Sequence, residues 1–579
     1  MASRGSRRAP GRGDGADSVR GWGLASLVVV VVACLARLPA LGTWWCLDDW
    51  GQLARACGLA PGGGGFPARW LSQHLWWSLT WPILGLHAGA HAALRLVLHA
   101  LAAATVVRIA RRASLRPAGG LVAGLLFAAT PIASTPLFWA SGVQELLSGL
   151  LALLAIERWL AGDRLSLLLA GLFGIGSMLS KEVGLGLPLL FAGLLGLRAG
   201  PKGSDRRWGW LVVCALLVVA ASEAILVARH FATGANDRYS LAGGLVPLGN
   251  LGKFGWWLMT PGPVFTGQVT WALAGWGLAA FAAWAVWGVF AWRRGRPLPA
   301  LALAAALLGL APALPLVQQA KPYMAYLAAA AAALTLGELV KSRRSLAWLP
   351  ALGGAVAAAV WGFVGMHFWI DNRTADGLPA DSVVRAARTA RETAAFIGHR
   401  LPAGGLARGT ALVVFQQPLH PDAIARVERL GDAAVVPTPR HTALEGATGL
   451  SVIAGTGVPA RWTASLLDVP ASAFVFCESG TGLEAWGPTG TALLYAAAVD
   501  ILGGNDEPAR AELLRAAALG ENLGRFHYDQ KAIGVPAPVL LRKARAFRDR
   551  LAAAAMGGSA EAARAMALLD VLAARLAAP

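Results

Sequence analysis

The sequence predicts a polytopic α-helical membrane protein with a C-terminal α/β domain outside the membrane. Hydrophobic residues make up 56% of the 579 residues and charged residues only 14%, whereas soluble chains average about 25% charged residues. Long apolar runs continue to residue 369, and beyond it the runs become short and alternate with polar turns. The 24 tryptophans fit this class, because tryptophan favours membrane–water interfaces.

The apolar runs predict eleven transmembrane helices, since about 20 apolar residues cross a bilayer. We expect them near residues 22–41, 85–109, 117–135, 142–160, 164–180, 183–198, 208–229, 270–292, 298–317, 322–340 and 346–369. A basic tail, residues 1–20, precedes the first run. That run is too long for a signal-peptide core and has no clear cleavage site, so we expect it to remain as a signal anchor.

Short clusters of basic residues between the runs indicate which side of the membrane each loop lies on. They are Arg4, Arg7, Arg8 and Arg12; Arg108, Arg111, Arg112 and Arg116; Arg158 and Arg164; Arg198, Lys202, Arg206 and Arg207; Arg293, Arg294 and Arg296; and Lys341, Arg343 and Arg344. In an eleven-span chain all of them lie on one side, which the positive-inside rule identifies as the cytoplasm. The N-terminus is therefore expected in the cytoplasm and the C-terminal domain outside it. The net charge of +19 belongs largely to these loops, so nucleic acid is not an expected partner.

An acid pair, Asp48 and Asp49, lies just after the first run on the predicted external side. No further Asp or Glu occurs from Trp50 to Gln144. Acids at a membrane edge are costly to desolvate and usually have a task or a partner. We interpret one of the two as a catalytic general base, and helix capping is the alternative. Neither the spacing nor the chemistry of the two adjacent acids indicates which of them is the base.

Further ionisable residues fall on the same predicted side. Sugar transfer from a polyprenyl phosphate needs a base for the acceptor hydroxyl and cations for the departing phosphate. The candidate phosphate-binding residues are Arg69, Lys181, Arg229, Arg238 and Lys321. A local ion pair between Lys181 and Glu182 is an equally open interpretation.

Histidines and tyrosines near this side are possible site-lining residues. His91 and His99 share a helix face, but a metal site needs a further ligand and a fixed geometry, so we expect packing or hydrogen bonding and no metal. Tyr239 and Tyr323 either line the site or anchor the interface. A disulfide between Cys46 and Cys57 remains open.

Residues 371–579 predict an extracytoplasmic α/β domain. We expect an amphipathic helix at 380–400, strands at 411–415, 450–454 and 473–477, and helices near 537–555 and 559–577. The domain contains no nucleophile elbow, P-loop or metal-ligand spacing.

An ordered series of motifs over residues 20–370 resembles the GT-C glycosyltransferase superfamily. It is most similar to the branch of protein O-mannosyltransferase-like and lipid A aminoarabinose-transferase-like enzymes. The motifs are Leu47-Asp48-Asp49-Trp50, Arg69, the helix from His91 to His99, Phe127 to Ile132, Trp139 to Gly142 with Glu145, Ser180-Lys181-Glu182, Arg229 with Arg238-Tyr239, and Lys321-Pro322-Tyr323.

The resemblance implies an inverting hexosyl- or pentosyltransferase of the bacterial plasma membrane and cell envelope. The donor would be a polyprenyl-phosphate-linked sugar, and the acceptor a protein, lipid or glycan. Asp48 or Asp49 would be the base, Glu145 and Glu182 supporting acids, and Lys181 a partner of the lipid phosphate. No cofactor is implied, and a divalent cation is left open.

Two other classes remain as alternatives. A transporter or flippase is expected to carry acids or broken helices at mid-span, and often repeats, whereas the acids here fall at span ends. A non-catalytic membrane scaffold with the same fold is not distinguished by sequence.

Overall fold

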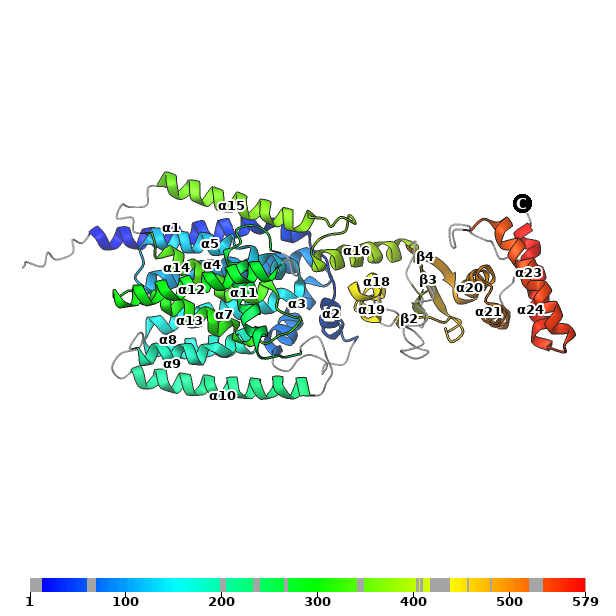
Figure 1. Cartoon of the computed structure of the whole chain (residues 1–579), viewed down its shortest axis with the longest axis horizontal. Helices are drawn as coiled ribbons and strands as arrows, with labels where there is room; N and C mark the ends of the chain where they lie inside the picture. The colour runs from blue at the N-terminus through cyan, green and yellow to red at the C-terminus, as the bar shows by residue number, and fades with distance from the viewer. Residues whose placement is uncertain are drawn as a thin grey trace, which may run out of the picture. The chain divides into compact units, whose positions relative to one another are not determined.

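The computed structural model describes residues 13–59, 69–197, 205–232, 240–264, 269–340, 348–401, 406, 410–416, 438–455, 458–479, 482–519 and 535–577. Arg238 and Tyr239 lie outside these residues, as do several of the basic loop residues. The chain divides into two compact units, residues 1–52 with 61–387 and residues 53–60 with 388–579 (Figure 1).

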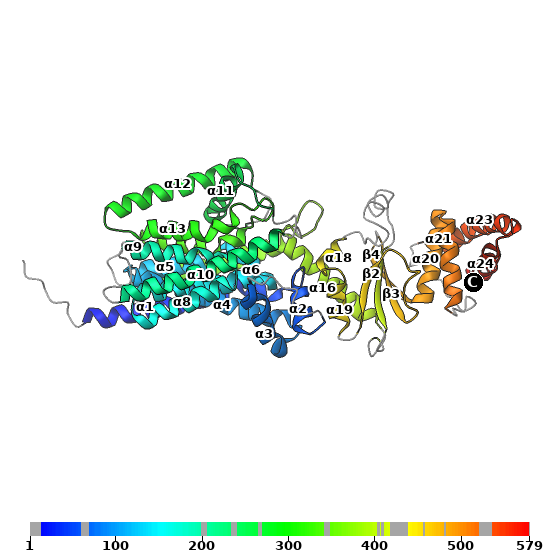
Figure 2. The same ribbon diagram turned by 90° about the horizontal axis from the view of Figure 1, so that it is seen from below.

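The first unit is a helical bundle. Its longer helices are α1 (Gly13–Arg37), α4 (Ala88–Arg112), α7 (Val143–Ala161), α10 (Asp205–Ala232), α12 (Trp271–Arg293) and α15 (Trp348–Asp371). Its shorter helices are α2 (Asp49–Ala56), α3 (Trp76–Leu84), α5 (Pro117–Ala128), α6 (Ser134–Phe138), α8 (Arg164–Met178), α9 (Leu187–Gly196), α11 (Leu245–Met259), α13 (Leu298–Leu310) and α14 (Tyr326–Gly337). The long helices lie roughly side by side in both ribbon views (Figures 1 and 2).

Short turns join these helices. They are η1 (Leu38–Gly42), η3 (Leu71–Leu75), η4 (Pro131–Ala133), η5 (Ala140–Gly142), η6 (Glu182–Gly186), η8 (Ala311–Ala313) and η9 (Pro322–Ala325). Several begin with proline at their first or second position, where the missing N–H costs nothing.

Six helices in the described part of the chain are long and apolar enough to cross a membrane. They are Arg20–Gly42, Ala88–Arg112, Ala140–Ala161, Asp205–Arg229, Trp271–Arg293 and Pro350–Asp371. The bent pair Pro117–Ala128 and Pro131–Phe138 makes a seventh if it is one span. Every predicted range contains a helix, but α8, α9, α13 and α14 are short, and the count of eleven spans is not confirmed.

Small residues let the helices approach closely. A Cβ atom on Gly277 of α12 would lie 1.8 Å from the Gly252 carbonyl oxygen of α11. A Cβ atom on Gly119 of α5 would likewise lie 2.6 Å from the Gly337 carbonyl oxygen of α14. Glycine at these contacts permits the backbone-to-backbone packing typical of membrane helices.

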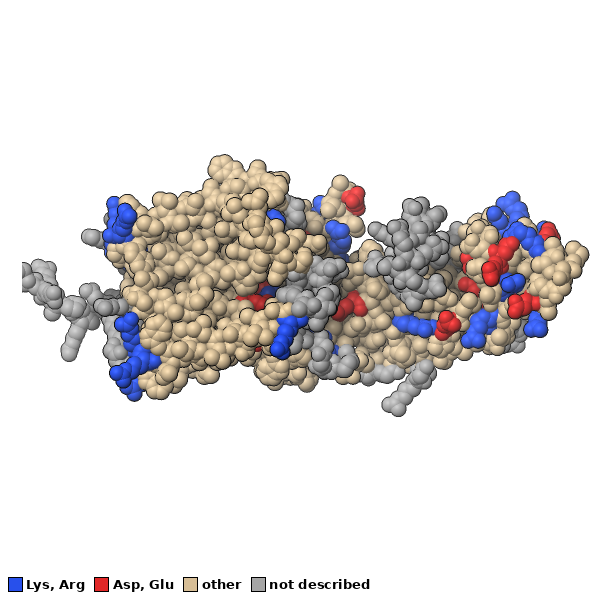
Figure 3. Space-filling model, turned by 60° about the horizontal axis from the view of Figure 1, so that its bottom comes forward, with Lys and Arg blue, Asp and Glu red and all other residues tan. Residues whose placement is uncertain are grey.

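Charged side chains divide between the two ends of the bundle. On the face in Figure 3, Lys and Arg gather at one end, and a broad belt of uncharged residues separates them from the charges beyond. Ion pairs between Arg112 and Glu157, Arg164 and Asp205, and Arg296 and Glu338 join helices at this basic end. The basic loop residues that form these pairs, which belong to the described part of the chain, thus lie at one end of the bundle.

The second unit contains a four-stranded sheet in the order β2-β1-β3-β4. The strands are β1 (Ala411–Gln416), β2 (Ala460–Thr463), β3 (Ala473–Ser479) and β4 (Gly482–Pro488). β1 pairs in parallel with β2 and β3, and β4 is antiparallel to β3. The predicted strands at 411–415 and 473–477 are confirmed.

The helices of the C-terminal region are α16 (Ser382–Arg400), α18 (Pro439–Ala443), α19 (Ala447–Ala454), α20 (Thr489–Gly503), α21 (Asp506–Ala518), α23 (Ala537–Met556) and α24 (Ala560–Ala577). The predicted strand at 450–454 is wrong, because these residues belong to α19. A short apolar run has no periodicity that separates a strand from a buried helix. The helices predicted at 380–400, 537–555 and 559–577 match α16, α23 and α24.

Candidate functional site

Asp49 is a buried structural anchor at the start of α2. Its carboxylate accepts hydrogen bonds from the Cys46 amide (3.0 Å), the Ser141 amide (2.7 Å) and the Ser141 hydroxyl (2.6 Å). Its side chain is fully buried. The bond back to Cys46 resembles the acidic half of a capping box, and the bonds to Ser141 tie this loop to η5 just before α7.

Burial raises the pKa of Asp49 to about 6, although the bonds from Ser141 and Cys46 and the charge of Arg95 oppose the rise. The Arg95 side chain donates from Nε to the Leu137 carbonyl (3.0 Å) and from Nη2 to the Phe138 carbonyl (3.3 Å). Asp49 and Arg95 therefore hold the segment 137–141 together.

Asp48, unlike the buried Asp49, lies at the surface. Its side chain is exposed, and no hydrogen bond or ion pair joins its carboxylate to another described residue. The preceding residue, Leu47, has φ of +54°, a conformation that leucine adopts only where the surrounding structure holds it. Of the two acids, Asp48 is the one that a substrate can reach.

A third acid, Asp381, completes this region and was not predicted. It caps α16, since its carboxylate accepts from the amides of Val383 (2.8 Å) and Val384 (3.4 Å). Burial chiefly, and then the charges of Asp49, Asp48 and Asp381, raise the pKa of the Cys46 thiol. The three carboxyls are thus grouped around one cysteine, whose Sγ lies 3.8 Å from the Val383 carbonyl.

Lys321 lies near Asp381. Burial lowers the pKa of this half-buried ammonium, and the charge of Asp381 opposes the shift. Within the described residues, no carboxylate comes within ion-pair distance of it. Lys321 is therefore a cation that remains available for an anionic ligand.

Four other predicted acids and bases, Arg69, Glu145, Lys181 and Glu182, form ion pairs. Arg69 forms a bidentate ion pair with Glu182 (2.7 and 3.0 Å) and donates to the Gln144 side chain (3.0 Å). Lys181 pairs with Glu145, and its Nζ lies 5.4 Å from the centre of the Tyr323 ring. Lys181 and Glu182, although adjacent in sequence, have different partners, so the local ion pair between them is not formed.

His91 and His99 are packed inside the bundle. His91 stacks on Trp77 and lies edge-on to Trp45, with ring centres 5.6 and 5.0 Å away. His99 hydrogen-bonds the Tyr326 hydroxyl (2.7 Å) and the Ala128 carbonyl (3.1 Å). No three His, Cys, Asp or Glu side chains come together as metal ligands would in the described residues.

Arg229, Glu223 and the thiols of Cys46 and Cys57 remain to be described. Arg229 is exposed near the end of α10. Glu223 on the same helix is a buried acid that was not predicted, although a lone ionisable residue in an apolar helix is a recognisable signal. Cys46 and Cys57 are both free thiols, so the disulfide considered above is not formed.

Comparisons with known proteins give structural similarities alone. No family model and no curated protein matches the chain. It is similar to the apo oligosaccharyltransferase of Archaeoglobus fulgidus, with a TM-score of 0.37 and 13% identity over 69% of this chain and 62% of that one.

Two further structures of oligosaccharyltransferases from Archaeoglobus fulgidus are also similar. Oligosaccharyltransferase AglB in complex with an inhibitory peptide and a dolichol-phosphate gives a TM-score of 0.39 at 14% identity, over 69% and 62% of the two chains. The complex with Zn and sulfate gives 0.36 at 14% identity, over 68% and 60%. The chain thus spans 60–62% of the length of these proteins.

Proposed function

We propose that the chain is a membrane glycosyltransferase that moves a sugar from a polyprenyl-phosphate donor to an extracytoplasmic acceptor hydroxyl, with Asp48 as the general base. The contrast within the acid pair carries this proposal. A general base must lie within hydrogen-bond reach of the proton that it removes. Asp49 is buried and already accepts three hydrogen bonds, whereas the exposed Asp48 carboxylate is free to meet an acceptor.

In the proposed reaction, Asp48 takes the proton of the acceptor hydroxyl. The acceptor oxygen bonds to the anomeric carbon as the bond from that carbon to the phosphate oxygen breaks, with inversion at the sugar. The bonding electrons leave on the polyprenyl phosphate. Cations stabilise such a leaving group, and we assign this role first to Lys321. Arg69 and Lys181, paired with Glu182 and Glu145, would shape the site.

The chemical class of the substrates follows from the same proposal. The donor sugar is a hexose or a pentose, and the acceptor is a protein, lipid or glycan at the outer face of a bacterial plasma membrane. The basic end of the bundle would face the cytoplasm. A phosphatase fusion after Asp371 should then be active in a bacterial host, and one after Arg294 inactive.

Substitution of Asp48 tests the chemistry directly. Asp48→Asn should lower the turnover of purified protein with polyprenyl-phosphate sugars by about 10²- to 10⁴-fold, the usual contribution of positioned proton transfer. Its thermal unfolding should match that of the wild type, because the carboxylate is exposed. Asp376→Asn, another exposed acid, is the matched control.

Two outcomes would contradict the proposal at different levels. Wild-type turnover in Asp48→Asn would remove the base assignment. If the wild type transfers no sugar and lipid-linked sugar does not accumulate in a deletion strain, the protein is not a transferase of this kind. For the leaving group, Lys321→Met should lower kcat/KM more than Lys321→Arg does.

A further inference from the structure

A large cavity opens at the basic end of the bundle, at the other end from the acid pair. Its volume is about 760 Å³, within the about 300–1,000 Å³ range of small-molecule sites. Helices α4, α7, α9, α13 and α14 line it, together with residues 113–116, 295–297, 338 and 340. None of its residues belongs to the proposed catalytic site.

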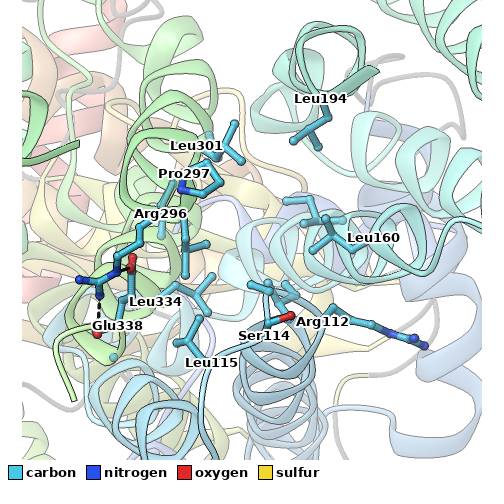
Figure 4. Close-up of a pocket in the computed structure, with 18 of the residues that line it drawn as sticks. Arg112, Ser114, Leu115, Leu160, Leu194, Arg296, Pro297, Leu301, Leu334 and Glu338 are labelled. Atoms are coloured by element: carbon cyan, nitrogen blue, oxygen red, sulfur yellow. Dashed lines mark hydrogen bonds and ion pairs between the residues drawn. The ribbon is translucent and has the colours of Figure 1, made fainter. Parts of the chain in front are cut away.

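The interior of the cavity is apolar. Figure 4 shows Leu160, Leu194, Leu301 and Leu334 around a common space, each from a different helix. Most of the remaining interior is leucine, isoleucine and alanine. Such a lining offers contact to hydrocarbon and little to a polar molecule.

The mouth of the cavity carries a surplus of positive charge. Arg112 lies on one side, and Arg296 pairs with Glu338 on the other (2.6 Å; Figure 4). Arg116 also lines the cavity. Arg112 shares its acidic partner, Glu157, with Arg108 and Arg158, at distances of 3.0 to 3.3 Å. Asp163 is a second carboxylate that interacts with the charge of Arg112. Two carboxylates thus face three guanidiniums, so positive charge is left over beside the cavity.

We propose that this cavity binds an anionic membrane phospholipid, with one acyl chain among the leucines and the phosphate at the arginines of the mouth. The apolar interior and the basic rim match the two parts of such a lipid. Basic pockets between transmembrane helices on the cytoplasmic side bind anionic head groups in this way. The side chains of Arg112 and Arg296 are 42% and 39% exposed, which lets them reach a head group.

The test compares lipids that share acyl chains and differ in charge. Native mass spectrometry of the purified full-length protein should show stronger retention of phosphatidylglycerol than of phosphatidylcholine. The double variant Arg112→Gln/Arg116→Gln should retain phosphatidylglycerol about 5-fold more weakly per arginine removed, the usual contribution of a basic residue near an anionic membrane surface. Glu157 keeps two arginine partners in this variant, so the fold should persist.

Two further variants separate the head group from the chain. Arg164→Gln removes an exposed arginine of the same end that pairs with Asp205 outside the cavity, and it should leave retention unchanged. Ala305→Phe fills part of the cavity and should weaken retention of both lipids.

Three outcomes would overturn the proposal. Equal retention of the two lipids by the wild type would show that charge plays no part. An equal loss in Arg164→Gln would indicate general surface attraction. Stabilisation by inorganic phosphate alone, together with unchanged lipid retention in Ala305→Phe, would indicate a free-anion site without an acyl chain.

Discussion

Charged side chains are paired differently at the two ends of the helical bundle. At the acid end two buried ion pairs are matched one to one, Glu182 with Arg69 and Glu145 with Lys181. At the basic end, three arginines share Glu157, and their side chains are 29–42% exposed. The first arrangement fixes the positions of the paired side chains. The second leaves positive charge that is available to membrane lipids.

The difference follows from burial. A buried ion that loses its partner costs several kcal/mol, so each member of these two buried pairs depends on the other. An exposed arginine is hydrated and can be present in surplus at little cost. Four substitutions or titrations test this contrast, from the largest expected effect to the smallest.

Lys181→Met should have the largest effect on stability. It leaves the Glu145 carboxylate buried without its cation, and breaking such a pair typically costs about 3–5 kcal/mol. The unfolding of purified protein measures the loss, and the double variant Lys181→Met/Glu145→Gln should recover part of it. Lys253→Met is a control, since Lys253 hydrogen-bonds an asparagine rather than an acid.

The opposite result would change the role of Lys181. If Lys181→Met unfolds like the wild type and only donor use is weakened, its ammonium is a phosphate ligand, as the sequence suggested, and its contact with Glu145 is of little energetic weight.

Asp49→Asn should be the next most damaging change. The amide keeps one acceptor oxygen and places an NH2 group against a donor, either the Cys46 amide or Ser141. A buried donor without an acceptor costs about 1–3 kcal/mol. Asp48→Asn should change the free energy of unfolding by less than about 0.5 kcal/mol, as is usual for exposed positions. Similar losses in both variants would remove the distinction between the two acids.

The sequence predicted the acid pair but not the difference between its members. That difference depends on Ser141, which lies 92 residues after Asp49 in the chain. Likewise Lys181 pairs with Glu145, 36 residues earlier, and not with its neighbour Glu182. Residue type and hydropathy mark which groups gather at one end of a bundle, whereas individual partners depend on tertiary packing.

The helical ranges were predictable for the same reason. A long apolar run has few alternatives to a helix in a bilayer, and every predicted range contains one. Local signals were weaker elsewhere. The apolar run at 450–454, predicted as a strand, forms part of α19. The role of Asp381 as the N-cap of α16 was not predicted, because that helix was assigned wholly to the C-terminal extracytoplasmic domain.

The third test uses the pKa of Asp49, which burial raises from 3.8 to about 6. Between these values the folded protein binds more protons at this group than the unfolded chain does, so its contribution to stability falls as pH rises. Acidification from pH 7 to 5 should therefore stabilise the wild type, relative to Asp49→Asn, by about 1 kcal/mol. Unfolding of both proteins at pH 7, 6 and 5 gives this difference. A difference that does not change with pH would show that Asp49 does not titrate in this window.

Arg108→Gln should have the smallest effect, although it also removes a charge from an ion pair. Glu157 keeps Arg112 and Arg158, so its buried carboxylate stays compensated. The Arg108 side chain is 42% exposed, so water already hydrates its guanidinium in the wild type. Removing this guanidinium also relieves its repulsion from the two other arginines. We expect a change below about 0.5 kcal/mol in the free energy of unfolding, as for most exposed ion pairs. Arg108 does not line the cavity, so phosphatidylglycerol retention should fall less than in Arg112→Gln/Arg116→Gln. A loss near the 3 kcal/mol or so expected for a buried pair would mean that the Glu157 cluster is coupled as tightly as the pairs at the acid end, and the contrast between the two ends would then not hold.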